Sequence, residues 1–127
     1  MREELLRSSI DWDVAESIAG RPIPEAVRDF YNDPSLTLRT SVEIRADGRL
    51  WHIEYFNPLG MALETGRDRK RLDIATDECG NQYSVSLTLP VSPVWHRDHD
   101  TGDEVIVAAS LDGFKQLVCA SGHKPPR

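Results

Sequence analysis

The sequence predicts an α+β fold: an antiparallel or mixed sheet of about five to six strands, with two N-terminal helices and one C-terminal helix packed on it. Two observations lead to this prediction. Helical apolar spacing occurs near both ends of the chain, and alternating or short apolar runs fill the middle. Because the strand patterns follow one another directly, the order argues against alternating strands and helices.

Length and composition are those of one domain. The chain has 127 residues, so we expect a single domain over residues 1–127, with its core at about 10–120 and a frayed tail at 121–127. The longest apolar run, at 105–109, is far shorter than the roughly 20 residues that span a bilayer. The N-terminus has no apolar stretch of signal-peptide length. We therefore expect a cytoplasmic protein whose cysteines are free thiols.

Two short helices are expected near the N-terminus. The first covers about residues 11–19 and has Ser8 or Ser9 as a candidate cap. Val14 and Ile18 lie four positions apart on one of its faces. The second helix starts at a proline, which suits the first helical turn. Its apolar stripe, at positions i, i+3 and i+4, consists of Val27, Phe30 and Tyr31.

Residues 40–56 are typical of a β-hairpin that turns on Asp47 and Gly48. A two-residue loop fixes the register of such a hairpin and thereby decides which side chains share a face. The apolar face pairs Ile44 with Trp51 and Val42 with Ile53, and Tyr55 extends it. The other face gathers Glu43, Arg45, His52 and Glu54.

A loop is expected at residues 59–71, which contain two glycines and a basic cluster of Arg67, Arg69, Lys70 and Arg71. The cluster is short and lacks interleaved aromatic side chains, so a solvated loop, or a loop that meets an acidic patch of a partner, is favoured over a nucleic-acid site.

The remaining segments complete the sheet and add the last helix. A short strand is expected at 72–75, another begins at 94, and a buried strand covers 105–109. Between them, a half-buried strand alternates Tyr83, Val85, Leu87 and Leu89 with Ser84, Ser86 and Thr88. Ser110 is expected to cap a final helix. The apolar positions of this helix are Leu111, Phe114, Leu117 and Val118.

Charge is distributed unevenly along the chain, whose net charge is −6. Residues 72–113 hold eight acids and one base, which gives −7, whereas residues 1–71 hold thirteen acids and eleven bases, which gives −2. An acidic C-terminal half disfavours nucleic acid as a partner and favours a basic protein surface. The predicted partner-binding residues are Asp77, Glu78, Asp98, Asp100, Asp103 and Glu104.

Two catalytic alternatives rest on other polar residues. His96, Asp98 and His99 are legitimate metal ligands. However, an extended segment would point the two histidines to opposite faces, and no third ligand is marked nearby. A hydrolase with the paired carboxylates of Glu43 and Glu54 has less support. No phosphate-binding loop, nucleophile elbow or zinc-helix motif is present in the sequence. We therefore expect no catalytic residue, metal or cofactor.

Three stretches in order carry a family resemblance. Residues 23–31 resemble a proline-initiated early helix, and residues 74–83 resemble a strand, glycine turn and strand unit. Residues 93–100, with an Asp-His-Asp turn, lead to a final helix motif at 108–114. In their order and spacing, over roughly residues 20–120, they are similar to the SUKH superfamily, the group of yeast cell-wall regulator-like and bacterial immunity proteins.

The resemblance implies an α+β fold and a role as an immunity or antitoxin-like protein, which neutralises a polymorphic toxin by occluding it. Many such toxins are basic enzymes, so an acidic face would speed their encounter. Trp95 is a candidate anchor if it is exposed and otherwise a core residue. A regulatory or scaffolding interaction domain without a toxin partner, and the metal-dependent hydrolase of His96, Asp98 and His99, remain the alternatives.

Overall fold

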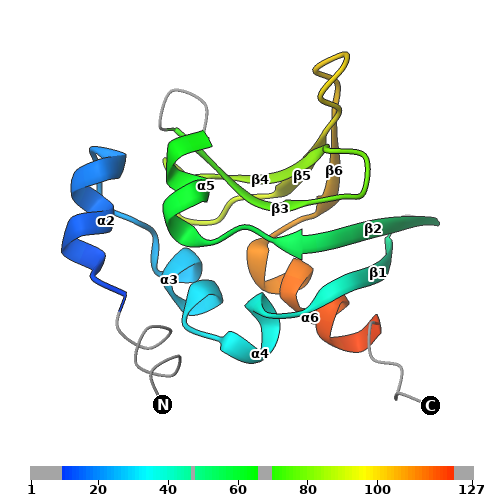
Figure 1. The fold of residues 1–127 in the computed structure, drawn as a ribbon, viewed down its shortest axis with the longest axis horizontal. Helices are drawn as coiled ribbons and strands as arrows, with labels where there is room; N and C mark the ends of the chain where they lie inside the picture. Colours follow the sequence, from blue (N-terminus) through cyan, green and yellow to red (C-terminus); the bar gives the residue numbers. More distant parts are fainter. Residues whose placement is uncertain (1–9, 47, 66–69, 122–127) are drawn as a thin grey trace.

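The computed structural model describes residues 10–46, 48–65 and 70–121. These residues form a six-stranded antiparallel sheet in which the strands stand in chain order (Figure 1). The strands are β1 (Thr40–Ala46), β2 (Arg49–Phe56), β3 (Arg71–Thr76), β4 (Gln82–Ser86), β5 (Val94–Arg97) and β6 (Glu104–Ala108). The helices are α2 (Trp12–Ala19), α3 (Glu25–Tyr31), α4 (Pro34–Thr37), α5 (Leu59–Thr65) and α6 (Leu111–Ser121). The α+β prediction is confirmed, with every strand pair antiparallel.

The C-terminal helix α6 covers one face of the sheet. It packs against β1 and β6, and α3 packs against α6 in turn (Figure 1). Phe114 of α6 is fully buried and lies 5.8 Å from the ring of Tyr83 on β4, measured between centroids. The predicted cap is confirmed, because the Ser110 hydroxyl accepts a hydrogen bond of 3.0 Å from the Gly113 amide. The buried apolar residues form one cluster between the sheet and these helices.

The hairpin register predicted from the sequence is confirmed. Ile44 lies opposite Trp51, and Val42 lies opposite Ile53. The prediction that Tyr55 extends this buried face is wrong: 43% of Tyr55 is exposed, and Phe56 is buried instead. Tyr55 and Phe56 are also the residues through which β2 pairs with β3.

The loop expected at residues 59–71 contains helix α5, so that prediction is wrong. The apolar residues Leu59, Ala62 and Leu63 have the i, i+3, i+4 spacing of a helix, and the latter two are buried. The amide of Ala62 donates to the carbonyl of Pro58 at 2.9 Å, which forms the first turn. Of the basic cluster, Lys70 is exposed and the final arginine begins β3, while Arg67 and Arg69 lie outside the described residues.

Helix α2 presents a different face to the protein than the sequence predicted. Val14 and Ile18 are 53% and 39% exposed, whereas Ala15 and Ala19 are buried. The helix packs against α5, and its small side chains face the protein. Its cap is Asp11, whose carboxylate accepts the amides of two residues in the first turn. The serines expected to cap it lie outside the described residues, as does the tail beyond residue 121.

Strand β4 is buried on both faces, not half-buried as the alternating pattern predicted. Ser84 is fully buried and donates to the Asp73 carboxylate at 2.7 Å. The Arg97 guanidinium lies 3.1 Å from the same carboxylate, which is 1% exposed. This buried ion pair satisfies the polar face of the strand, because each charged group has its hydrogen-bond partner.

The outer strand β6 is only partly buried, so the expectation of a buried strand at 105–109 is wrong in part. Val105 and Ile106 are 41% and 53% exposed, while Val107 and Ala108 are buried. The reason is the place of β6 in the sheet: it is an edge strand and has a neighbour on one side only. A short apolar run does not distinguish an edge strand from a central one.

Two further predictions can be compared with the structure. Both cysteines, Cys79 and Cys119, are unpaired and exposed, as expected. In the described part of the chain, no helix combines the length and the apolar composition needed to cross a membrane.

Candidate functional site

The three hairpin turns of the sheet lie at one end of it. This follows from the topology, because consecutive antiparallel strands place alternate connections at the same end. The turns join β1 to β2, β3 to β4 at residues 77–81, and β5 to β6 at residues 98–103. We call this end of the sheet the turn end. The β5–β6 hairpin projects beyond the rest of the sheet (Figure 1).

Asp77 organises the turn between β3 and β4. Its carboxylate accepts hydrogen bonds from the amides of Cys79 and Asn81, both at 2.9 Å, and from the Asn81 side chain at 3.0 Å. Burial acts to raise the pKa of Asp77, but hydrogen bonds from His96, Asn81 and the Cys79 amide outweigh it, and the pKa is lowered. The side chain is 11% exposed. Asp77 is therefore a structural anion of the turn.

His96 connects this turn to the aromatic core. Its Nε2 lies 3.0 Å from the Asp77 carboxylate. Its ring centroid lies 5.0 Å from those of both Trp51 and Tyr83. Since one ring nitrogen is hydrogen-bonded and the ring contacts two aromatic side chains, His96 is fixed in place.

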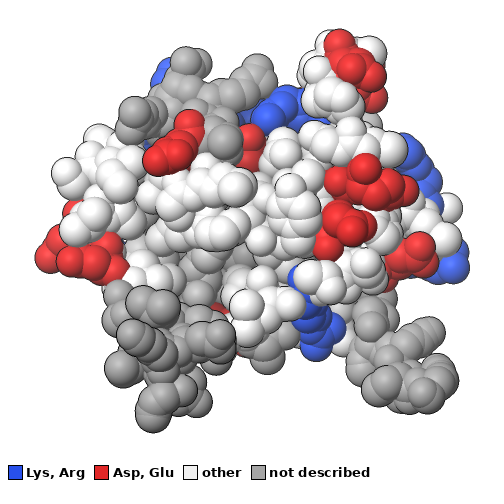
Figure 2. All heavy atoms as spheres, in the orientation of Figure 1, with Lys and Arg blue, Asp and Glu red and all other residues white. Residues whose placement is uncertain are grey.

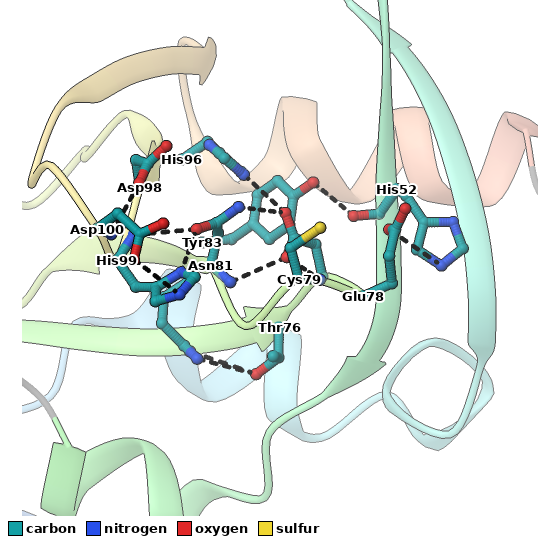
Figure 3. Close-up of polar contacts among 12 residues, drawn as sticks. His52, Thr76, Glu78, Cys79, Asn81, Tyr83, His96, Asp98, His99 and Asp100 are labelled. Atoms are coloured by element: carbon teal, nitrogen blue, oxygen red, sulfur yellow. Dashed lines mark hydrogen bonds and ion pairs between the residues drawn. The ribbon is translucent and has the colours of Figure 1, made fainter.

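The two acidic turns are joined by a pair of side chains. The side-chain oxygen Oδ1 of Asn81 accepts the backbone amide of His99 at 2.9 Å and lies 2.7 Å from the His99 Nδ1 (Figure 3). Within the second turn, Asp98 accepts the amides of Asp100 and Thr101. These amide hydrogen bonds lower the pKa of Asp98. The turns at 77–81 and 98–103 thus form one hydrogen-bonded unit.

A second group of acids surrounds His52 on β2. Its Nε2 lies 2.9 Å from Glu54 and 3.7 Å from Glu78, and its Nδ1 lies 4.0 Å from Glu43. The backbone carbonyl of His52 accepts the Tyr83 hydroxyl at 2.6 Å. Burial raises the pKa of Tyr83, so the hydroxyl stays protonated and donates. This hydrogen bond links the His52 group to the two turns.

The six acids predicted to bind a partner fall into two classes. Glu78 and Asp100 point outward, with side chains 58% and 80% exposed, and Asp103 is exposed as well. Glu78 and Asp100 lie 3.7 Å and 3.3 Å from the Nε2 atoms of His52 and His99. The other three acids are engaged more fully: Asp77 and Asp98 accept backbone amides of their turns, and Glu104 forms a bidentate pair with Arg71. The outward acids are the ones available to a partner.

The sequence reasoning missed some residues of this site. The hairpin register had placed His52 beside Glu43 and Glu54, but nothing in it brought Glu78 to the same histidine. The link from Asn81 to the second turn depends on a tertiary contact, which local sequence does not reveal. Trp95 is half-buried, with the Arg71 guanidinium 3.8 Å above its ring, and does not form an exposed anchor.

The metal hypothesis does not fit the geometry as predicted. Among the described residues, the group of three or more whose ligand atoms lie within 4.8 Å of one another consists of Asp98, His99 and Asp100. His96 is not part of it and is paired with Asp77. In this group, Asp98 already accepts two amides, and the His99 Nδ1 is hydrogen-bonded to Asn81. The paired glutamates of the hydrolase hypothesis both contact His52 from exposed positions.

Charge at the turn end is acidic but not continuous. Figure 2 shows red acidic side chains at the tip of the β5–β6 hairpin and in separate groups over the right-hand end of the sheet, with basic side chains beside them.

Comparison with known proteins finds no relative of this chain. No family model matches the chain, and neither the curated proteins nor the solved structures include a significant match.

Proposed function

We propose that the protein binds a basic protein partner through the turn end and neutralises it by occlusion, as an immunity or antitoxin-like protein. The observation that carries the proposal is the placement of Glu78, Asp100 and Asp103: all three are exposed on the two joined turns. We propose no catalytic role for these residues.

Acidic side chains on preorganised turns suit such a partner for two reasons. A fixed arrangement of like charges attracts an oppositely charged surface and increases the association rate. Preorganisation also reduces the ordering cost of binding, and the hydrogen bonds through Asn81 and Asp77 hold these turns before a partner arrives. Both effects act on binding and need no bound metal or cofactor.

The toxin as partner, and the cytoplasm as the compartment, come from the resemblance to the SUKH superfamily and from the charge of the chain. Both are part of the proposal. The gene neighbourhood discriminates the main alternative: a toxin gene next to this one supports immunity, and its absence supports a regulatory or scaffolding interaction domain.

The test is calorimetry of the purified chain against the product of the neighbouring toxin gene. We expect tight, stoichiometric binding that weakens as salt is added, because charged surfaces are screened. The triple variant Glu78→Lys, Asp100→Lys, Asp103→Lys should weaken binding at least about 100-fold, the equivalent of about 2.7 kcal/mol. It leaves the structural acids Asp77 and Asp98 untouched.

The matched control makes the same change in charge elsewhere. It is the triple variant Asp13→Lys, Glu25→Lys, Glu64→Lys, three acids that are exposed on helices α2, α3 and α5. If both triple variants bind the toxin with the Kd of the parent protein, the turn end is not the interface. Equal weakening by both would assign the effect to net charge and would contradict a specific acidic site.

A further inference from the structure

An apolar groove lies at the opposite end of the sheet, where residues 87–93 connect β4 to β5. One depression of about 270 Å³ is lined by this connector and by the first turns of α3 and α6, including Val91 and Leu111. A second depression of about 370 Å³ lies beside it and includes Arg21. The two share a wall, because both are lined by Pro24, Leu89 and Pro90. Together they form what we call the connector groove.

The groove exposes apolar side chains that the core does not need. Leu89 is 43% exposed and Val91 is 69% exposed, although both come soon after the buried strand β4. Leu89 had been expected to continue the buried face of that strand, but the strand ends at Ser86. Adjacent exposed apolar residues beside a depression are typical of a binding surface.

Arg21 brings a cation without a counter-ion to this groove. Three other arginines have ion pairs: Arg28 with Glu16, Arg71 with Glu104 and Arg97 with Asp73. In the same described residues, the Arg21 side chain has no ion pair, and its buried Nε has no hydrogen-bond partner. A half-buried guanidinium beside apolar walls attracts a carboxylate, because the low local polarity strengthens the interaction.

We propose that the connector groove binds an extended peptide segment of a partner protein, with two apolar side chains at alternate positions and an acidic residue beside Arg21. Side chains i and i+2 of an extended chain lie on one side, roughly 7 Å apart. Two adjoining depressions with a shared wall accept such a pair. The charge of Arg21 selects the acidic residue. This surface lies at the other end of the sheet from the acidic turns, so the proposal stands independently of the function proposed above.

The test uses the full chain and two sets of capped heptapeptides. In the first set, Leu or Phe occupies two alternate positions and Glu follows. The second set has Lys in place of Glu. Nitrogen-15 chemical shifts of the protein, followed during titration, locate the site and give the Kd. We expect the Glu set to shift the resonances of residues 87–91 and Arg21, and to bind at least about 10-fold more tightly than the Lys set.

Two variants test the named residues. Arg21→Gln should weaken the Glu set about 10-fold and remove its advantage over the Lys set. Val91→Asp, at an exposed position, should abolish binding of both sets while the dispersed spectrum is kept. The matched controls are Arg45→Gln and Leu50→Asp, which remove an exposed cation and an exposed apolar residue from the β1–β2 hairpin and should leave binding unchanged.

Several results would overturn the proposal. One is the absence of saturable binding by either peptide set. Another is peptide binding that neither Arg21→Gln nor Val91→Asp weakens. A third is peptide binding that shifts the resonances of residues on another surface. A parallel titration with monomeric oleate tests whether the groove binds a fatty acid. If oleate shifts the resonances of the groove residues and the peptides do not, the site binds a lipid and the peptide proposal is wrong.

Discussion

At the scale of single residues, the conformation of the turn end is held by side chains that point inward, not by those that face solvent. Asp77 receives hydrogen bonds from the turn and from His96, and Asn81 then links that turn to the next one. The outward acids Glu78 and Asp100 depend on this network for their positions. Substitutions at inward and outward acids should therefore have different effects, on stability and on binding respectively.

The inward acid gives a prediction about pH. The folded-state pKa of Asp77 is lowered below the ordinary value of about 3.9, so its carboxylate stabilises the fold fully above that value. This contribution is lost as the pH falls from about 4 through the folded-state pKa. Asp77→Asn should therefore lower the free energy of unfolding by about 1–3 kcal/mol at pH 7. The difference in the free energy of unfolding between the parent protein and Asp77→Asn should become smaller below pH 4. Urea unfolding at each pH measures it.

The difference between the two proteins is the quantity to follow, because the pKa values of Glu16 and Asp98 are also lowered and both proteins lose their contributions in acid. The control is Asp100→Asn, at a side chain that is 80% exposed, which should change stability little at any pH. A difference for Asp77→Asn that stays constant from pH 7 to pH 3 would mean that its carboxylate does not act as a structural anion.

At the scale of elements, the hairpin and α5 show what local sequence does and does not determine. The two-residue loop fixes the β1–β2 register, since a slip by one residue would move Ile44 and Trp51 to the polar face. The glycines in residues 59–71 predict a loop, so the sequence pattern did not indicate helix α5. Its stability comes from the burial of Ala62 and Leu63 against the sheet, and propensity alone does not report such tertiary packing.

Two glycines should respond in opposite ways to replacement by alanine. Gly60 lies in α5 with helical backbone and open space around it, so Gly60→Ala should raise the free energy of unfolding by about 0.5–1 kcal/mol. Gly80 has φ of +87° in the turn held by Asp77, so Gly80→Ala should lower it by about 1–2 kcal/mol. Thermal and urea unfolding measure both, and a gain at Gly80 or a loss at Gly60 would contradict the assigned conformations.

At the scale of the whole molecule, the sequence predicted the layers but not the surfaces. Apolar periodicity is set by burial, so the α+β order followed from it. The two-residue loop decided the register, and the capping preference of serine predicted the cap at Ser110. Which acids point outward depends on contacts between distant segments, such as Glu104 with Arg71, and local pattern does not contain them. The connector groove was missed for the same reason: Leu89 continues an alternating pattern beyond the point where the strand ends.

The last prediction concerns the relation between the two proposed surfaces. The acidic turns and the connector groove lie at opposite ends of the same strands, because alternate connections of an antiparallel sheet leave from opposite ends. Sites that share no contact residues behave additively, so a change at one should leave the other unchanged. The Glu78, Asp100 and Asp103 triple variant should bind the acidic peptides with the Kd of the parent protein.

In the reciprocal experiment, Val91→Asp should bind the toxin as the parent protein does. Titrations of each variant with each ligand measure both halves of this prediction. The decisive titrations are those of each variant with the ligand of the other surface. A change of more than about 3-fold in the Kd of either one would correspond to a coupling free energy of about 0.6 kcal/mol, above what independent sites show. Such coupling would contradict the independence of the two surfaces and would have to pass through the sheet that joins the two ends.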